Sequence, residues 1–186
     1  MRKYYIADCH FGDEEVIRFS HRPFSTVQEM DETMIERWNR TVKISDEVYI
    51  VGDLIHRCSE PEKYLARLNG RLHLILGNHD RCIAENPSLH RYFSEITTYA
   101  VVYDGHHRLV LFHYPMLEWD GYYYGTWHLY GHIHNHPSLT QERVKELPKA
   151  LNCGADVVGY CPRTFDELVA INKRDCYRSA RPQGAV

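Results

Sequence analysis

Polar residues of the metal-ligand type recur where the predicted strands of this chain end, and no other feature limits the fold as much. The set comprises Asp8, His10, Asp53, Asn78, His113, His132 and His134, and His79 stands directly beside Asn78. Because open α/β sheets place their ligands at the carboxyl ends of strands, we expect these side chains to meet at one edge. The set has the size and chemistry for two divalent cations that share a carboxylate, with one histidine left for proton transfer.

Apolar runs that stop at glycine or at a polar residue predict the strands. The first three are expected over residues 3–7, 47–51 and 72–76, and Gly52 and Gly77 end the second and third. Residues 97–103 and 108–112 are expected to form two more strands, joined by a hairpin turn at 104–107. The last predicted strands are short and cover residues 128–130 and 151–153.

Helical spacing and capping signals predict three helices, near residues 27–40, 61–69 and 164–171. Thr26 with Glu29, and Thr164 with Glu167, have the spacing of capping boxes at two of the starts. Early strands that alternate with helices and are followed by hairpins predict an α/β protein, specifically a mixed-sheet sandwich.

The bulk properties are those of an ordinary globular protein. The 186 residues fit one domain with a sizeable core, expected over residues 1–177, and residues 178–186 are expected to form a flexible tail. The net charge of -3 gives no basic surplus for nonspecific nucleic-acid binding. The first residues run straight into a predicted strand, so we expect no signal peptide. No apolar run has membrane-spanning length, and the six cysteines form no C-x-x-C pair, so we expect a cytoplasmic protein that does not contact a membrane.

The spacing of the polar residues indicates how they would bind metal. Asp8 and His10 are two residues apart, as are His132 and His134, and alternation along an extended chain is expected to point both members of each pair the same way. Asp53 is the natural bridge, because a carboxylate can offer one oxygen to each of two metals. Mixed imidazole and carboxylate ligation suits manganese, iron, cobalt, nickel or zinc, and the lack of thiolate ligands is unlike a structural zinc site.

Together these segments resemble the calcineurin-like metallophosphoesterase superfamily, whose pattern is D-x-H, GD, GNHD or GNHE, H and GHxH, in that order. The matching segments here are Asp8-Cys9-His10, Gly52-Asp53, Gly77-Asn78-His79-Asp80, His113 and Gly131-His132-Ile133-His134. The match spans residues 8–134, and its order and completeness make it specific. Residues 152–156 are similar to a branch of small bacterial phosphohydrolases without a capping domain.

The resemblance implies an αββα sandwich with two metals. One metal takes Asp8, His10, Asp53 and His134, and the other takes Asp53, Asn78, His113 and His132. The resemblance also implies that His79 is the general acid and that Asp80 holds its ring. Arg57 fits a phosphate clamp beside a second candidate substrate contact, His56, although His56 and Cys58 depart from the family's usual continuation.

The implied reaction is hydrolysis of a phosphomonoester or phosphodiester by a metal-bridging hydroxide, with His79 protonating the leaving group. A nuclease is an alternative, which the lack of an extra domain and of basic charge disfavours. An interaction scaffold with the same fold is another, which the presence of every ligand and of His79 disfavours. The aromatic-rich segment 114–127 is expected either to stack on a nucleotide-like substrate or to pack against its own domain or a partner subunit, which leaves a homo-oligomer open.

Overall fold

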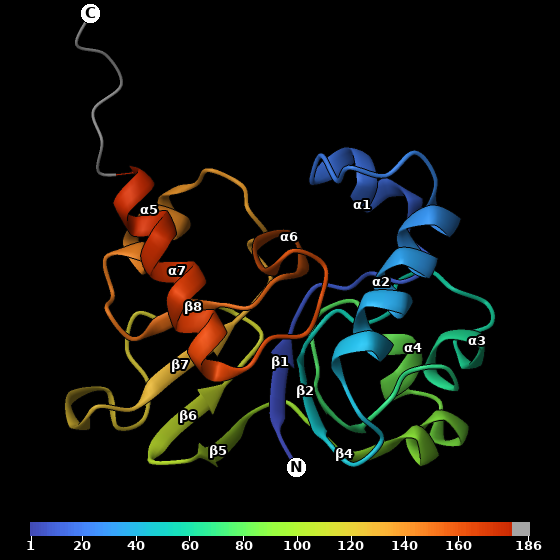
Figure 1. Ribbon diagram of the computed structural model, residues 1–186, viewed down its shortest axis with the longest axis horizontal. Helices are drawn as coiled ribbons and strands as arrows, with labels where there is room; N and C mark the ends of the chain where they lie inside the picture. The colour runs from blue at the N-terminus through green and yellow to red at the C-terminus, as the bar shows by residue number, and fades with distance from the viewer. Residues whose placement is uncertain (180–186) are drawn as a thin grey trace, which may run out of the picture.

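The first sheet contains four parallel strands in the order β1-β2-β3-β4. They are β1 (Lys3–Ile6), β2 (Glu47–Val51), β3 (Arg71–Ile75) and β4 (Phe93–Thr97). The computed structural model describes the backbone of residues 1–179 and the side chains as far as Lys173 (Figure 1). The first three strands match the predicted ones to within a residue at each end, and β4 lies outside any predicted strand except at Thr97.

The second sheet is mixed and has the order β5-β6-β7-β8. Its strands are β5 (Ala100–Asp104), β6 (His107–Leu111), β7 (Trp127–Tyr130) and β8 (Ala150–Asn152). The β5–β6 pair is antiparallel, as the predicted hairpin requires, whereas β6, β7 and β8 run parallel to one another. The predicted single strand over 97–103 is wrong, because the chain leaves the first sheet at Thr97 and enters the second at Ala100. The Thr97 hydroxyl donates to the Tyr99 carbonyl and closes the intervening turn.

The long helix α2 (Val27–Thr41) confirms the predicted helix near 27–40. The Thr26 hydroxyl accepts the Glu29 N–H at 3.1 Å, and the buried face includes Met30, Met34 and Trp38. The predicted helix over 61–69 shrinks to α3 (Glu62–Leu65). It ends early because Asn39 of α2 donates to the Arg67 carbonyl and accepts the Asn69 N–H, which takes these groups out of helical hydrogen bonding.

The last helix, α7 (Phe165–Ser179), begins where the Thr164 and Glu167 capping box predicted and runs eight residues beyond the predicted end. The expected tail therefore begins inside α7, and residues 180–186 lie outside the described residues. Six short helices of the described chain were not predicted from the sequence: α1 (Glu14–Phe19), α4 (Arg81–Ala84), η1 (Pro87–Tyr92), η2 (Tyr122–Tyr124), α5 (Leu139–Lys145) and α6 (Ala155–Val158).

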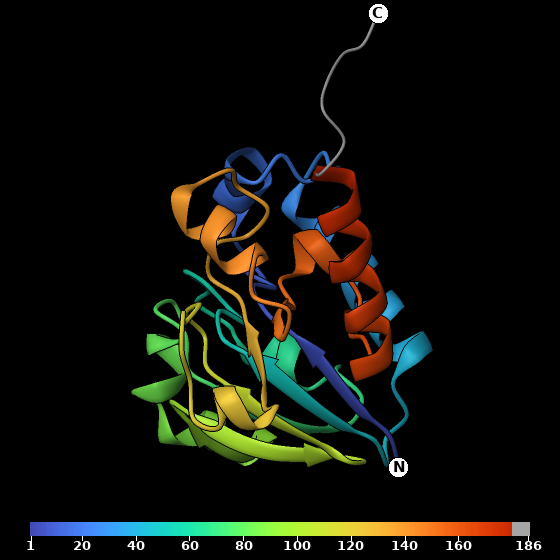
Figure 2. The same cartoon turned by 90° about the vertical axis from the view of Figure 1, so that its left-hand side faces the viewer.

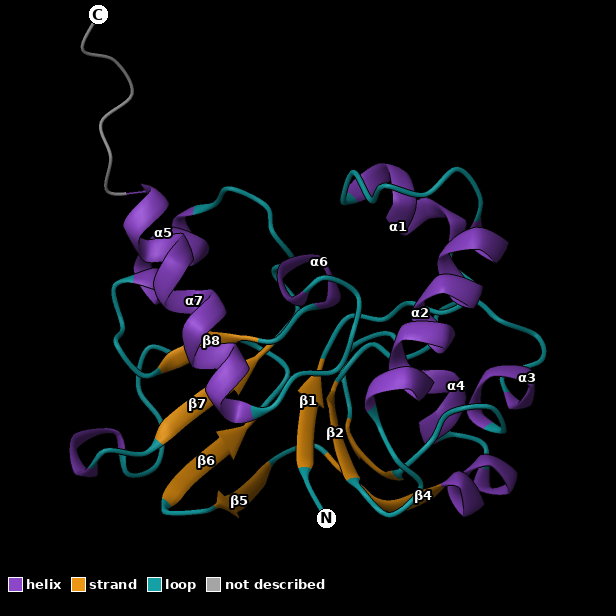
Figure 3. Ribbon diagram, viewed as in Figure 1, coloured by secondary structure: helices purple, strands orange, loops and turns teal. Residues whose placement is uncertain are grey.

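The two sheets lie between helices, which gives the expected αββα arrangement (Figure 3). Leu109, Leu111, Leu129 and Leu151 of the second sheet join the main core with β1, β2, β3 and α2. The alternating residues Val110, Tyr130 and Ala150 form a second cluster with Val144 of α5 and with Trp119. The chain is therefore a mixed α/β sandwich whose core lies between the sheets.

The end of β1 joins the two sheets. The Ala7 N–H donates to the Cys153 carbonyl, and the Ala155 N–H donates back to the Ala7 carbonyl. Figures 1 and 2 both place the N-terminus and α1 at opposite edges of the molecule, so the strands that start near the N-terminus end on the side of α1. Within residues 1–179, no helix is both long enough and apolar enough to cross a bilayer.

Candidate metal centre

The loops that follow the parallel strands carry all seven predicted ligands. Asp8 and His10 follow β1, Asp53 follows β2 and Asn78 follows β3, while His113 comes from the second sheet after β6, and His132 and His134 come after β7. The site lies where the two sheets meet, because each sheet contributes part of the set.

Five of these residues have a left-handed backbone, with φ of 54° at Asp8, 54° at His10, 55° at Asp53, 68° at His132 and 49° at His134. Residues other than glycine rarely adopt this backbone conformation, and those that do are concentrated at functional sites. The expected alternation along an extended chain is therefore wrong as a reason for the i, i+2 spacing. The pairs converge because sharp left-handed turns redirect the chain just beyond each strand.

The predicted ligands fall into two compact groups, and a third group of metal-ligand type, His10 with Asp13 and His56, shares His10 with the first. Asp8, His10 and His134 form the first group and Asp53, His113 and His132 form the second, and within each group the atoms lie within 4.8 Å of one another. The Asp53 carboxylate lies between the groups, since its Oδ2 is 3.2 Å from His113 Nε2 and 3.7 Å from His10 Nε2. Asn78 joins the second group, with its Oδ1 3.2 Å from His113 Nε2. The assignment of these residues to two metals stays a prediction.

His10 provides the clearest sign that a cation fits here. Both nitrogens of its ring are buried and have no hydrogen-bond partner among the side chains and backbone that the structure describes. Burying polar atoms without partners is costly, and such atoms are normally satisfied. A divalent cation with a preference for imidazole and carboxylate donors would satisfy the ring.

The charges around Asp53 also favour a cation. Burial tends to raise the pKa of Asp53, but the His113 ring and the His79 amide outweigh it and hold that pKa at about 2. Burial tends to lower the pKa of His113, but Asp53 and Asp8 outweigh it and raise that pKa to about 9. Asp53 and Asp8 therefore stabilise positive charge at His113, whereas burial lowers the pKa of His132 and of His79.

Two of the candidate histidines have a hydrogen-bond acceptor at Nδ1, which leaves Nε2 to face the centre. Val51 O is 2.9 Å from His113 Nδ1, and Asp156 Oδ2 is 2.7 Å from His134 Nδ1. Metal-binding histidines in proteins typically use their second nitrogen in this way. Asp13 Oδ2 comes within 3.3 Å of His10 Nδ1 without making a hydrogen bond to it.

Sequence reasoning missed the carboxylates of Asp13 and Asp156. Asp13 had a readable signal, since it precedes two acidic residues and caps α1 by accepting the Glu15 N–H. Asp156 lies in the segment 152–156 that resembles a family branch, but the resemblance gave it no role, because its contact with His134 joins the ends of two different strands.

Gly77 leaves room for the central carboxylate. A Cβ at Gly77 would lie 2.2 Å from Asp53 Oδ1, and its φ is not in the left-handed region. Gly52 differs, because it combines a φ of 89° with a close approach in which a Cβ would lie 2.1 Å from His113 Nδ1. The glycine before Asn78 is thus needed for space, and the glycine before Asp53 for both space and conformation.

Asp80 does not hold the His79 ring as the resemblance implied. Its buried carboxylate accepts the N–H groups of Asp53, Leu54 and Gly77, at 2.8, 2.9 and 2.8 Å. Burial raises the pKa of Asp80 to about 6, although these amides work in the opposite direction. With both oxygens occupied by the backbone, Asp80 pins the loop after β2 to the loop after β3.

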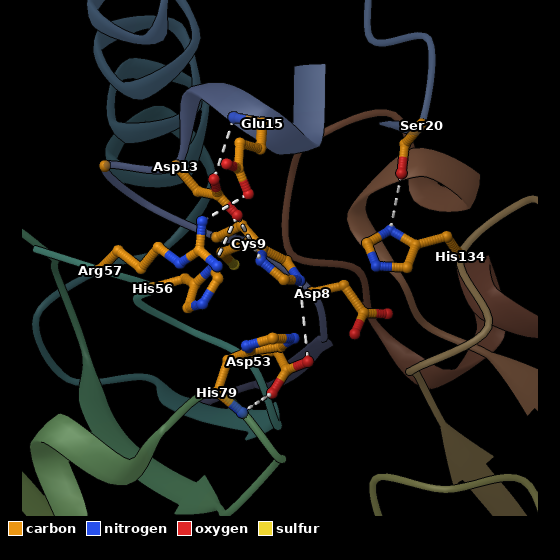
Figure 4. Close-up of polar contacts among 12 residues, drawn as sticks. Asp8, Cys9, Asp13, Glu15, Ser20, Asp53, His56, Arg57, His79 and His134 are labelled. Atoms are coloured by element: carbon orange, nitrogen blue, oxygen red, sulfur yellow. Dashed lines mark hydrogen bonds and ion pairs between the residues drawn. The ribbon is translucent and has the colours of Figure 1, made fainter. Parts of the chain in front are cut away.

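His79 lies at the mouth of the centre and is partly exposed. Its N–H donates to Asp53 Oδ1 at 2.8 Å, and its ring centroid lies 5.2 Å from that of His10 and 4.0 Å from that of His56. Burial is the main cause that lowers the pKa of His79; Asp53 opposes it and His56 reinforces it. Among the side chains that the structure describes, no carboxylate makes a hydrogen bond with the ring, which lies beside the candidate ligands (Figure 4).

The two candidate substrate contacts differ in how firmly they are held. His56 Nδ1 is 2.8 Å from Asp13 Oδ2, and the same carboxylate lies close to His10. Arg57 instead extends to Glu15 of α1, where Nη1 lies 2.5 Å from Oε2 and both side chains are exposed (Figure 4). Surface ion pairs of this kind contribute only about 0–1 kcal/mol, so a phosphate could displace Glu15 at little cost.

Most of the aromatic segment 114–127 lies away from the centre. Trp119 is buried and donates from its indole N–H to the Thr126 carbonyl. The tyrosines of η2 precede β7 at its amino end, whereas His132 and His134 follow its carboxyl end (Figure 1, gold). Stacking of these tyrosines on a substrate stays a prediction, which their place at the opposite end of β7 disfavours. Tyr114, whose ring centroid is 4.6 Å from that of His132, is an aromatic residue of the segment beside the centre.

Comparison with known proteins agrees with this geometry. The family model for calcineurin-like phosphoesterases matches residues 1–151. The chain belongs to the calcineurin-like phosphoesterase family. It is 32% identical over 179 residues to the uncharacterized protein MJ1445 of Methanocaldococcus jannaschii, and the match covers 92% of each.

Two solved structures are also similar. AQ665, a protein of unknown function from Aquifex aeolicus, superposes with a TM-score of 0.71 at 22% identity, over 91% of this chain and 98% of that chain, and so shares the fold. Yfce, a phosphoesterase from E. coli, is 16% identical with a TM-score of 0.36, over 83% of this chain and 78% of that chain. Family membership makes this calcineurin-like phosphoesterase a metal-dependent enzyme that acts on a phosphoester.

Proposed function

We propose that the protein hydrolyses a small phosphomonoester or phosphodiester with two divalent cations. One cation would be held by Asp8, His10, Asp53 and His134, and the other by Asp53, Asn78, His113 and His132. The observation that carries this proposal is the position of Asp53 Oδ2, which faces His10 Nε2 of one group and His113 Nε2 of the other at 3.7 and 3.2 Å. A carboxylate so placed is suited to bridging two ions.

The donor set favours manganese, iron, cobalt, nickel or zinc, since it combines imidazole nitrogens with carboxylate and amide oxygens. Two such ions would supply Lewis-acid polarisation of the phosphoryl group and activation of a water nucleophile. The protein's own contribution is to fix the donors before any ion binds, through the left-handed turns and the Asp80 contacts with the backbone.

His79 is proposed as the general acid that protonates the leaving oxygen. Its ring lies beside the ligand groups, with no hydrogen bond to a carboxylate among the described side chains, and its main-chain N–H is anchored on Asp53. A histidine in this position can deliver a proton to a leaving group and then exchange it with solvent. Asp80 acts indirectly, by fixing the two loops that carry Asp53 and His79.

His56 and Arg57 are proposed to contact the substrate phosphate. His56 is the better positioned, because Asp13 holds its Nδ1 and its ring packs against that of His79. Arg57 would first exchange Glu15 for the phosphate. Tyr114 is proposed as the surface on which a nucleotide-like leaving group stacks, since its partly exposed ring lies beside His132.

The deciding experiment is a panel of esters assayed after the metals have been stripped and restored one type at a time. The panel contains p-nitrophenyl phosphate, bis-p-nitrophenyl phosphate and a cyclic nucleotide, each with manganese, nickel, iron and zinc. We expect turnover only with added metal, and full activity only at two ions per chain. Full activity at one ion per chain, or equal activity without metal, would refute the proposal.

A further inference from the structure

Asp156 lies outside the region that the family model matches, yet it contacts a proposed metal ligand. It belongs to α6, and the matched region ends at residue 151. Its Oδ2 lies 2.7 Å from His134 Nδ1, and the side chains of both residues are almost wholly buried, at 0% and 6% exposure. A carboxylate this close to a ring nitrogen requires a hydrogen between the two atoms, so Nδ1 is the protonated nitrogen.

Ser20 contacts the same nitrogen. Its Oγ lies 3.1 Å from His134 Nδ1, and because a hydroxyl can accept as well as donate, this contact fits the Nδ1–H form (Figure 4). Asn152 fixes the backbone of His134, because its side-chain amide donates to the His134 carbonyl at 2.9 Å. Nε2 is thus left as the ligand nitrogen, on the side that faces Asp8 and His10.

Arg22 holds Asp156 in place. Its Nε is 2.8 Å from Asp156 Oδ1 and its Nη2 is 3.1 Å from Oδ2, a two-pronged contact in which both side chains are fully buried. The same guanidinium donates to the carbonyls of Asp8, at 2.6 Å, and Cys9, at 2.9 Å. Arginine suits this position because its planar group can contact a carboxylate and two carbonyls at once.

We propose that Asp156, locked by Arg22, is a positioning residue of the metal centre that keeps His134 Nε2 directed at the metal and in register with Asp8. This inference rests on the ligand set of the proposed function. It assigns the segment after β8 to the centre, because that segment supplies the carboxylate while β1 supplies the backbone that Arg22 holds. Removal of a partner of this kind typically weakens metal binding 10–100-fold.

The first test uses the unchanged protein. Nitrogen-15 NMR of labelled histidine, recorded on the metal-free chain at a pH where the imidazole is neutral, reports which ring nitrogen of His134 carries hydrogen. We expect the Nδ1–H form, with the signal assigned by its loss in His134→Ala. The Nε2–H form would overturn the proposal, whatever the behaviour of any variant.

The second test measures zinc binding by competition with a chelator in Asp156→Asn. We expect one of two zinc ions to bind 10–100-fold more weakly than in the parent protein. Asp46→Asn is the matched control, because Asp46 is also a buried carboxylate and accepts the Arg2 and Lys43 N–H groups before β2, at the far end of that strand from Asp53. Unchanged zinc affinity in Asp156→Asn, or an equal loss in Asp46→Asn, would contradict the positioning role.

His134→Ala separates this inference from the proposed function. If this variant keeps both zinc ions at parental affinity, the ligand set itself is wrong. If it loses one ion while Asp156→Asn keeps both, the ligand set stands and the positioning role fails. Should Asp156→Asn fail to fold, the NMR measurement on the unchanged protein still decides.

Discussion

Replacing Gly77 by alanine tests whether the centre depends on the exact place of the Asp53 carboxylate. The new methyl group would lie 2.2 Å from Asp53 Oδ1, closer than real Cβ contacts allow, and 2.7 Å from the Asp53 amide nitrogen. The backbone at Gly77 does not have a positive φ, so alanine brings no conformational strain of its own. The methyl group must therefore displace the Asp53 carboxylate, and with it the acceptor of the His79 N–H.

The size of the effect follows from that displacement. Moving a reacting group by about 1 Å costs on the order of 10²-fold in rate. Losing a hydrogen bond to a charged acceptor costs about 1.5–3 kcal/mol of unfolding free energy. For a chain of this length each kcal/mol lowers Tm by about 2–4 °C, so we expect a fall of about 3–12 °C.

Gly105→Ala is the control variant, in which we expect stability to fall while the metal centre stays intact. A Cβ there would meet nothing within 4 Å, but φ is 58°, so alanine is strained without touching the centre. We expect a stability loss of about 1 kcal/mol with full metal content and full activity. Metal analysis, calorimetry and kcat of both variants check the argument. Gly77→Ala with two metals bound at parental affinity and a rate within a few-fold of the parent would refute it.

Four further variants separate the proposed roles. Asp53→Asn removes charge from the proposed bridge, so metal content and turnover should fall together; two tightly bound metals with normal activity would exclude bridging. His79→Ala should keep its metals and lose about 10²–10⁴-fold in rate for alcohol leaving groups but less for p-nitrophenolate, and an equal loss for both would exclude the general-acid role. Tyr114→Ala removes stacking worth about 1–3 kcal/mol and should raise KM for nucleotide-like esters but not for a small alkyl ester. Alanine at Tyr122, Tyr123 and Tyr124 should leave KM for both substrates unchanged. The reverse result would identify the three tyrosines as the stacking surface.

The convergence of the candidate ligands was predictable because its signal is local. Asp8, Asp53 and His132 each follow a short apolar strand, and parallel strands bring their carboxyl ends together whatever the details of the packing. The capped helices α2 and α7 were predictable for a similar reason, since the hydroxyls of Thr26 and Thr164 sit beside the amides they accept.

The remaining features depend on contacts between distant segments. Nothing near Thr97 indicates that the next strand belongs to another sheet, because sheet membership is decided by pairing with β3 and β6. The role of Asp80 likewise depends on amides of the loop after β2, which no spacing within the loop after β3 reveals. Left-handed φ values at non-glycine ligands are imposed by these surroundings against the residues' own preferences.

The pairing of Ala7 with Cys153 and Ala155 has a consequence for how the protein reaches its native state. It joins the end of the first strand to a segment that follows the last one. Contacts between residues so far apart in sequence form slowly, since the entropy of closing the loop must be offset before the contact stabilises anything. This pairing helps to bring the Asp8 and Gly154 loops together, so we expect high-affinity cation uptake to follow the main collapse during refolding. Stopped-flow refolding with a metal-sensitive dye would then record the closing of the sandwich as a phase slower than the burial of Trp38.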